Sequence, residues 1–560
     1  MPPPPGESVR RLPGEDARRG KEVVMIAIRE ARDTDTPGII SIYMATYGEE
    51  YAYPQYYDEY EIKKLVFSDE TLMLVAEDSE SGQVVGAASV ILEVGAYTDL
   101  VGEFGRLAVH PDYRRRGIGT ELLNRRIETV RDRVHVGLIE GRVTHPFTQA
   151  IAQQQGFAPV GFLPLKFVFG SRRESMGLLV RLFGRALELR RNNPRIVPEV
   201  YPLACTALEN CGLDADVIVD DESGAYPFGQ GFSVNELTTE GYSRLMRIER
   251  GRVRNREVFG PLRLQYGYFK LITHHSMYLV AREGGHIVGA IGFTLEHIDR
   301  VVRVFELISL RDDVVRLLLS ELEQRCRDEW NVAYMEIDVS AHAPRMQRTV
   351  LQLGWVPVAY VPALAFHEVE RLDLVKFARL LIPVEIGPVM LIPPTSEMAK
   401  LVLAAFKRRE VMPRLGELVD RAGLFQGLEE EQLERLAAAF RYVTFDAGIE
   451  VFSQGDRCEE MYLLLTGEVE IQIQGSAGPI GIVEPGECLG EVAVLMGGDH
   501  SASAVAVSEV EAGVLTRQDL DSLVRLRPGI GVVLYRNLAR GLGGKLRRAD
   551  LKNFDRTDLA

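Results

Sequence analysis

A short polar stretch in the first quarter of the chain combines three arginines with two glycines, in a spacing that suits the binding of a phosphate group. In order, its residues are Arg114, Arg115, Arg116, Gly117, Ile118, Gly119 and Thr120. Glycines at the start of a helix let a ligand come close to the backbone. The free N–H groups of the first helical turn, together with the positive end of the helix dipole, attract an anion there. The arginines add positive charge, so the pattern indicates a site for a pyrophosphate group.

Three elements must position this stretch. Residues 102–109 carry the apolar residues of a strand, residues 110–116 form a polar loop, and residues 118–134 have apolar residues at helical spacing. The apolar face of the expected helix consists of Leu123, Ile127, Val130 and Val134. The sequence therefore predicts a strand–loop–helix unit with both glycines at the start of the helix.

The phrase LAVHPDYRRRGIGTELL, residues 107–123, closely resembles the acetyl-CoA-binding motif of the GNAT acyltransferase superfamily. The resemblance implies an α/β (α+β) fold in which this strand separates from its neighbour and acyl-CoA lies in the opening. It implies that the backbone at Leu107, Ala108 and Val109 holds the pantetheine arm, while residues 114–120 hold the pyrophosphate. The N–H group of Leu107 is then the expected donor to the thioester carbonyl.

Glu103 precedes this motif, at the position where several GNAT enzymes keep a general base. A carboxylate there can take a proton from an amine, directly or through water. The alternative is a glutamate in water at the edge of the sheet. His110, in the loop, is interpreted as a structural residue.

A second phrase, HPFTQAIAQQQGFAPVGF at residues 145–162, resembles another GNAT motif. Many members have a tyrosine four residues before its glycine, where it protonates the leaving thiolate, but Ala152 stands there in this chain. A thiol has a pKa of about 8.5, so a thiolate can leave with help from water, and the identity of the acid stays open. Residues 49–60, rich in tyrosine and acidic residues, either wall the acceptor pocket or pack on the sheet as an amphipathic loop.

The chain then repeats itself. VGAASVILE at residues 85–93 recurs as VGAIGFTLE at residues 288–296, and the proline, glutamine and glycine positions of residues 146–164 recur in residues 344–362. Matches of this density, in the same order, predict a second copy of the fold.

The loop of the second copy differs. Glu306 is aligned with Glu103, but no glycine opens the helix that follows, and Asp312 and Asp313 stand where phosphate would dock. These carboxylates would repel a phosphate. The second copy is therefore expected to be a degenerate GNAT domain that supports the structure or shapes the acceptor site.

The last third of the chain has short strands separated by turn glycines, which suggests an all-β barrel or jelly roll. Residues 445–471 and 486–507 resemble the cyclic nucleotide-binding domain family. In that family the helix after Gly-Glu wraps the cyclic phosphate, the glutamate takes the ribose hydroxyl, and an arginine pairs with the phosphate. The corresponding residues are Gly490, Glu491, His500 and Ser501. Because a neutral histidine lacks the arginine fork, we expect cyclic nucleotide to bind weakly or not at all.

The expected organisation is therefore two GNAT folds in tandem, followed by a jelly-roll cyclic nucleotide-binding-like domain with flanking helices. The expected segments are a disordered tail (1–22), a GNAT acetyltransferase domain (23–170), an extension and linker (171–231), a degenerate GNAT-like domain (232–367), a second extension and linker (368–414), the cyclic nucleotide-binding-like domain (415–550) and a tail (551–560).

Composition excludes several classes of protein. The 560 residues carry a net charge of −15, which argues against nucleic acid as a partner. No apolar run is long enough to span a bilayer, so stable membrane insertion is not expected. The five cysteines are scattered without metal-ligand spacing, which indicates plain thiols in the cytoplasm and no metal site. The sequence leaves oligomerisation open.

The sequence thus predicts an acetyl-CoA-dependent N-acetyltransferase that transfers an acyl group to an amine, either a protein lysine or a small molecule. The C-terminal domain is expected to regulate it. This pairing resembles bacterial cyclic-nucleotide-regulated protein lysine acetyltransferases, although their domain order differs. The alternative is a non-catalytic protein that senses acyl-CoA and a nucleotide-like ligand, which the absent tyrosine and the absent phosphate arginine keep open.

Overall fold

The computed structural model falls into two compact units, Met1–Val402 and Leu403–Ala560. The residues that it describes are 8–10, 25–48, 51, 53–93, 97–170, 172–252, 256–267, 271, 274–418, 422–429, 432–433, 436, 439–457, 459–476 and 478–557. Most of the expected tail, residues 1–22, lies outside these ranges. None of the described helices is long and apolar enough to cross a membrane.

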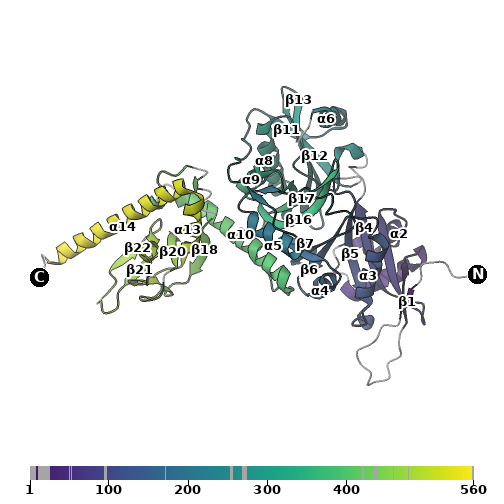
Figure 1. Ribbon diagram of the computed structural model, residues 1–560, viewed down its shortest axis with the longest axis horizontal. Helices are drawn as coiled ribbons and strands as arrows, with labels where there is room; N and C mark the ends of the chain where they lie inside the picture. The colour runs from purple at the N-terminus through teal and green to yellow at the C-terminus, as the bar shows by residue number, and fades with distance from the viewer. Residues whose placement is uncertain are drawn as a thin grey trace, which may run out of the picture. The chain divides into compact units, whose positions relative to one another are not determined.

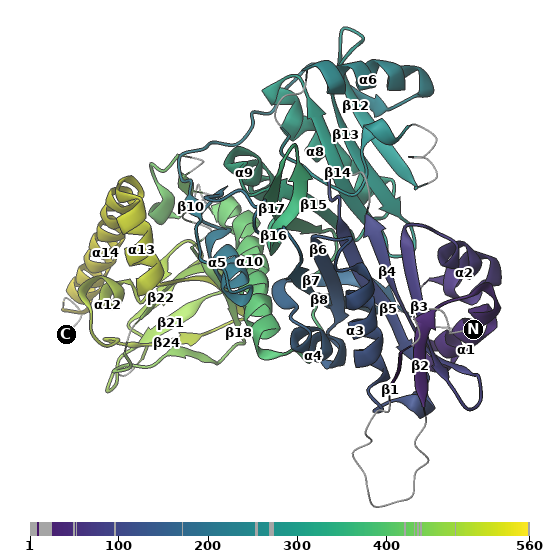
Figure 2. The same cartoon turned by 45° about the vertical axis from the view of Figure 1, so that its right-hand side comes forward.

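One sheet of 15 strands runs through the first unit, and its strand order repeats on the two sides of a central junction (Figure 1, Figure 2). From the junction outward, the first half contains β7 (Ala158–Phe169), β8 (Arg172–Leu182), β6 (Val136–Arg142), β5 (Val101–Val109), β4 (Val84–Glu93), β3 (Thr71–Asp78), β2 (Ile26–Glu30) and the edge strand β1 (Ser8–Arg10). The second half contains β16 (Val356–His367), β17 (Glu370–Leu380), β15 (Tyr334–Ser340), β14 (Val301–Ser309), β13 (His286–Glu296), β12 (Ser276–Glu283) and β11 (Ser233–Glu236).

Helices bury both faces of the first half. α3 (Ile118–Val130) packs Leu122 and Ile127 against Phe104 of the sheet, and α4 (Phe147–Gln154) contributes Ala152 to the same core. On the other face, α1 (Thr36–Tyr47) and α2 (Glu59–Val66) pack around Val75 of β3. In the second half, α8 (Asp312–Asp328) and α9 (Pro344–Gln352) stand in the chain where α3 and α4 stand in the first, and α6 (Thr239–Arg252) precedes the sheet hairpins.

The halves meet where β7 and β16 pair at a single position, Gly161 opposite Ala359. A side chain at Gly161 has no space, because its Cβ would lie 2.2 Å from the Cβ of Ala359 and 2.6 Å from the carbonyl oxygen of Val358. The joint between the half-sheets therefore depends on this glycine.

Two arginines, the fully buried Arg371 and the half-buried Arg173, donate hydrogen bonds across the joint. Arg173 of the first half donates to the carbonyl of Asp299 in the second half at 2.6 Å. Arg371 of the second half donates to the carbonyl of Asp99 in the first half at 3.1 Å. In its own half, Arg173 also donates to the carbonyls of Leu165 and Lys166. Arg371 likewise donates to the carbonyls of Ala363 and Leu364. The repeat thus extends to matching contacts on the two sides.

The segment that follows each half packs on the opposite half. After the first half come β9 (Arg195–Ile196), α5 (Tyr201–Asn210) and β10 (Ile218–Val219), and the N–H of Val197 donates to Gln347 of α9 at 3.1 Å. After the second half, the N–H of Ile392 donates to Gln149 of α4 at 3.4 Å, just before α10 (Pro393–Leu418) begins. The two halves are therefore interlocked by reciprocal arms, defined here as residues 183–231 and 381–402.

The second unit contains two four-stranded sheets. One comprises β18 (Arg441–Phe445), β25 (Val510–Thr516), β20 (Glu460–Thr466) and β23 (Cys488–Leu489), and the other β19 (Glu450–Phe452), β24 (Ser503–Ala506), β21 (Val469–Gln472) and β22 (Gly481–Val483). Leu464 and Val514 of the first sheet share a buried cluster with Val469 and Ala504 of the second, so the sheets pack face to face. The short helix η5 (Gly423–Phe425) precedes these strands, α12 (Glu491–Met496) lies between β23 and β24, and α13 (Arg517–Leu526) and α14 (Pro528–Thr557) follow β25.

We expect Gly161→Ala to lower the melting temperature of the protein, because the added methyl group would collide with Ala359 and with main-chain atoms that cannot move aside. Overpacking of this kind typically costs about 1–3 kcal/mol. Gly224→Ala is the matched control, since a Cβ there meets no atom within 4 Å. Equal thermal unfolding of the two variants would show that the joint tolerates a side chain.

Candidate functional site

The first half contains an open fork between β5 and β6. These parallel strands pair only from Val101 to Glu103, opposite residues 136–138. β5 stays paired with β4 up to Val109, and β6 stays paired with β8 up to Arg142. Beyond Glu103 the two strands therefore separate while each keeps its other neighbour.

A β-bulge shapes one arm of the fork. Arg106 and Leu107 of β5 together face one residue of β4, and Arg106 has a φ of 57°. The bulge is held from both faces of the sheet. Arg126 of α3 donates to the carbonyls of Ser89 (2.8 Å) and Gly105 (3.1 Å), and Tyr43 of α1 donates to the carbonyl of Arg106 (2.8 Å). A bulge leaves the extra residue out of the ladder, and Leu107, the expected donor to the thioester, belongs to this bulge.

Arg126 was not singled out from the sequence. It is buried, no carboxylate of the described residues pairs with it, and burial lowers the pKa of its guanidinium to about 9. In the sequence, the sign of such a residue is that Arg126 shares the apolar face of the expected helix with Leu122 and Ile127. Such a residue must satisfy its donors inside the protein, and here it does so on main-chain oxygens.

The loop after β5 combines left-handed residues with the start of α3. It contains the short helix η3 (Pro111–Tyr113), then Arg115 with a φ of 62° and Gly117 with a φ of 78°. Gly117 is the N-cap of α3, so the helix begins at Ile118 as expected, although it ends at Val130 rather than Val134. The free N–H groups of the first turn of α3 follow directly after these residues, and such groups suit an anion.

The side chains around the loop leave the start of α3 accessible. Arg114 donates to the carbonyl of Val109 at 3.4 Å, and Arg116 donates to the carbonyl of Asp112 at 3.1 Å. A Cβ on Gly119 would only touch Leu107 and Ile151, at 3.6 and 3.7 Å. Protein packing therefore does not demand a glycine at 119, whereas close approach of a ligand to the backbone does.

Glu103 lies at the base of the fork and is ion-paired. Its Oε1 accepts from Arg106 at 3.0 Å and leans toward Gly105, where it lies 3.8 Å from the position of an added Cβ. The guanidinium of Arg106 holds the pKa of Glu103 below its usual range. The carboxylate therefore stays ionised and can orient an amine, but it holds a proton only weakly.

The tyrosine-rich stretch packs against the end of β7. The rings of Tyr51 and Phe169 lie 6.5 Å apart, and those of Tyr53 and Phe167 lie 5.5 Å apart. The hydroxyl of Tyr53 donates to Asp299 of the second half at 2.5 Å. The described part of this stretch is therefore packed on the sheet, and it also links the first half to the second. Ala152, at the expected tyrosine position, is buried in the core of the first half.

A segment of the chain itself plugs the corresponding fork of the second half. β14 and β15 pair from Val301 to Val304 and then separate. Val258 pairs with Val339 of β15 in this opening, and the N–H of Phe259 donates to the carbonyl of Asp338 at 3.0 Å. Gly260 lies against β14 so closely that a Cβ would be 2.4 Å from the Cβ of Phe305. We call residues 256–264 the plug.

Glu306 anchors the plug from inside the protein. Its fully buried carboxylate accepts from Arg256 at 2.7 Å and from the N–H of Leu264 at 2.9 Å. It also accepts from the hydroxyls of Tyr278 (2.7 Å) and Tyr97 (2.9 Å). This carboxylate is structural.

The alignment of Glu306 with Glu103 is therefore wrong. Glu103 faces Ile91 across the ladder, and the residue in that place in the second half is Arg303, which faces Thr294. One strand of apolar and charged residues can be matched to another in several registers, and only the ladder decides between them.

In the second unit, two of the expected ligand-binding side chains, Glu491 and His500, contact other residues of the unit. Glu491 is buried and bonds Lys545 of α14 at 2.6 Å, and Lys545 also donates to the carbonyl of Cys488. The ring of His500 stacks on Phe452 with 3.7 Å between centroids. Burial lowers the pKa of His500, so it is neutral at pH 7. Ser501 is exposed.

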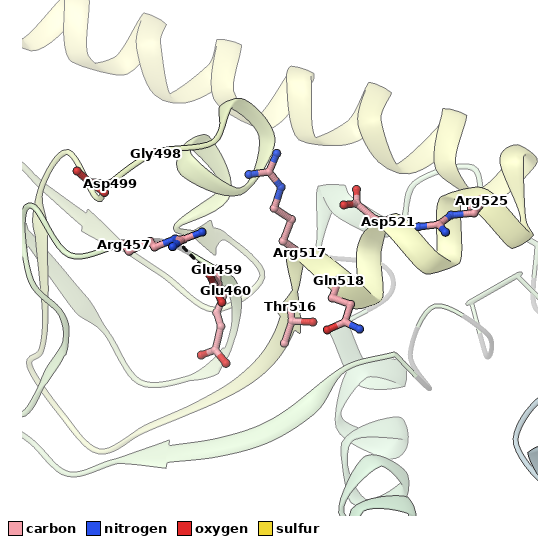
Figure 3. A pocket seen from close by; sticks show the side chains of 10 residues that line it. All are labelled: Arg457, Glu459, Glu460, Gly498, Asp499, Thr516, Arg517, Gln518, Asp521 and Arg525. Carbon is pink, nitrogen blue, oxygen red and sulfur yellow. Dashed lines mark ion pairs between the residues drawn. The ribbon is translucent and has the colours of Figure 1, made fainter. Parts of the chain in front are cut away.

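A surface hollow of about 540 Å³ in this unit has a different lining (Figure 3). Its charged residues are Arg457, Glu459, Glu460, Asp499, Arg517, Asp521 and Arg525. Arg457 and Glu459 pair at 3.2 Å, so opposite charges already meet within it. The lining contains neither Gly490, Glu491 nor His500.

Comparison with known proteins agrees with these two regions. Residues 36–157 match the Acetyltransferase (GNAT) family, and residues 442–526 match the Cyclic nucleotide-binding domain. The chain is 35% identical over 132 residues to the cyclic AMP receptor protein of Thermus thermophilus. It is 33% identical over 134 residues to the CRP-like cAMP-activated global transcriptional regulator of Mycobacterium tuberculosis. Each alignment covers 23% of this chain, and the chain spans 59% and 58% of the lengths of these two relatives.

Two solved structures align with a similar share of the chain. The Thermus thermophilus catabolite activator protein is 33% identical, with a TM-score of 0.22 over 24% of this chain and 63% of that chain. A cAMP-binding acyltransferase from Mycobacterium smegmatis is 29% identical, with a TM-score of 0.19 over 23% of this chain and 40% of that chain. From the matched families, this chain contains a GNAT acetyltransferase domain and, C-terminal to it, a cyclic nucleotide-binding domain.

Proposed function

We propose that the protein is an acetyl-CoA-dependent N-acetyltransferase whose first half binds acetyl-CoA and transfers the acetyl group to an amine. The acceptor is a protein lysine or a small-molecule amine. The observation that carries the proposal is the contrast between the two forks. The first is open and is followed by a bulge and by a loop in which Arg115 and Gly117 are left-handed, while the second is plugged by residues 256–264.

The residues of the first fork fit acetyl-CoA. The backbone from Leu107 to Val109 would hold the pantetheine arm, and the N–H groups of residues 115–120 would hold the pyrophosphate. Glu103, kept ionised by Arg106, would orient the amine. The second half is then a degenerate GNAT copy that supports the first through the joint and the reciprocal arms.

The C-terminal domain would regulate the transferase, with cyclic nucleotide as a weak ligand at most. Its relatives are named for cyclic AMP. In this chain, however, a ribose hydroxyl would have to displace Lys545 from Glu491. A cyclic phosphate would also meet neutral His500 in place of an arginine, and burying an anion needs a cation or several donors.

Calorimetry should find one acetyl-CoA site per chain, and Gly117→Glu should abolish it. The substitution places a side chain at a φ of 78° and a negative charge beside the phosphates. Gly285→Glu is the matched control, because it adds the same charge at a φ of 81° in a hairpin turn of the second half. Two equivalent sites, or normal binding by Gly117→Glu, would contradict the proposal.

Wild-type protein should bind cyclic AMP weakly or not at all at pH 7, and His500→Arg should raise the affinity. A charge-assisted hydrogen bond contributes about 1.5–3 kcal/mol, which is roughly tenfold to over a hundredfold in affinity. Because the pKa of His500 lies below 6.5, any gain of affinity by the wild type should appear only below that pH.

Titration with cyclic AMP and cyclic GMP at pH 7.5 and at pH 5.5 measures this. Gln472→Arg, at an exposed position of β21, controls for the added charge. Tight binding by the wild type at both pH values would show that another group holds the phosphate.

A further inference from the structure

We propose that Glu93, at the end of β4, accepts the proton that the acceptor amine releases, and that it acts through Glu103 and water. This inference rests on the function proposed above. The observations that carry it are the place of Glu93 in the ladder and an unsatisfied oxygen on its carboxyl group.

Glu93 and Glu103 lie on the same face of the sheet. Glu103 faces Ile91 across the antiparallel ladder, and Glu93 faces Val101, two residues further along each strand. Diagonal neighbours in such a ladder are roughly 7–8 Å apart. Glu103 leans toward Gly105 and the bulge, so Glu93 lies on its other side, away from the expected thioester.

The carboxyl group of Glu93 is incompletely satisfied. Its Oε2 is buried and lies near the hydroxyl of Thr98, but the geometry gives neither atom a full hydrogen bond among the described residues. Buried polar atoms are nearly always paired, so each exception needs an explanation. A carboxyl group that exchanges a proton through water with Glu103 provides one.

The charges around Glu93 come from both halves. They are Glu103 of β5, Arg303 of β14, Asp338 of β15 and, from the loop before β12, Tyr266. Arg303 is paired with Glu336 and does not form an ion pair with Glu93. Burial raises the pKa of Glu93 to about 7, whereas Arg106 lowers that of Glu103. Two neighbouring carboxyl groups with separated pKa values suit different roles in proton transfer.

The proton balance of the step is complete. One proton of the ammonium group passes through Glu103 and water to the Glu93 carboxylate, which becomes a carboxylic acid. The amine lone pair forms the C–N bond, the C–S bond breaks with its electrons on sulfur, and the thiolate takes the second proton that the nitrogen loses. Glu93 then returns its proton to solvent.

The pH dependence of acetyl transfer tests the role of Glu93. Acetyl-CoA turnover is measured as thiol release, with spermidine and with a lysine-rich peptide, from pH 5.5 to 9. In the wild type, kcat/KM should rise through pH 7. Glu93→Gln should lower kcat/KM about 10²-fold and should abolish its rise through pH 7. Glu103→Gln should also lower kcat/KM, but kcat/KM should still rise through pH 7.

Glu296→Gln is the matched control. Glu296 faces Val301 as Glu93 faces Val101, but it is exposed and belongs to the plugged half. This variant should behave like the wild type. If kcat/KM of Glu93→Gln still rises through pH 7 as in the wild type, the role of Glu93 is overturned, while the transferase function stays in place.

Two readouts do not depend on turnover. Infrared difference spectra should show a protonated carboxyl band that titrates near pH 7 in the wild type and is absent in Glu93→Gln. Because the folded-state pKa is raised, folding favours the protonated form, and stability falls as pH rises toward 7. Glu93→Gln should therefore melt higher than the wild type at pH 8 and nearly equally at pH 5. A titrating band without transfer to any amine would overturn both the proposed function and the role of Glu93.

Discussion

The first unit depends on two guanidinium groups held between main-chain oxygens, that of Arg371 fully buried and that of Arg173 partly buried. Arg173 and Arg371 each donate to a carbonyl of the opposite half and to two of their own. Neither guanidinium has a carboxylate at hydrogen-bond distance among the described residues, and burial lowers the pKa of Arg371 to about 10. An unpaired buried charge is costly unless every donor is satisfied. The two half-sheets must therefore hold those carbonyls in fixed places, and this fixes how the fork of the first half lies against the second.

Within this frame, nearly equivalent halves have become chemically different. Both have a strand pair that separates after a few residues. In the first, Arg126 and Tyr43 hold the bulge from either side, and the strands stay apart beyond Glu103. In the second, Glu306 gathers donors from Arg256, Leu264 and two tyrosines, and the chain fills its own opening. One buried carboxylate thus makes the fork of the second half part of its structural core.

The parts of the site that depend on neighbours in sequence could be predicted. The turn from β5 into α3 follows from the run of arginines and glycines, and α3 starts at Ile118 as its apolar spacing indicates. The internal repeat predicted a second strand order like the first. Long-range contacts could not be predicted in this way. The plug joins Val258 to Val339, and Lys545 reaches Glu491 across 54 residues, so neither leaves a local pattern. The error at Glu306 has the same origin, because register is a property of paired strands.

The reciprocal arms also set the order in which the protein can mature during synthesis. The hydrogen bond between Gln149 and Ile392 can form only after another 243 residues have been synthesised. At about 5–20 residues per second, that interval lasts roughly 12–50 s. During this time the first half has its complete loop at residues 110–117 but lacks the arm that packs on α4. The second half, in contrast, meets its own arm as soon as it forms, since residues 183–231 have already been made. The half that holds the candidate active site is therefore the last part of the unit to be completed on the ribosome.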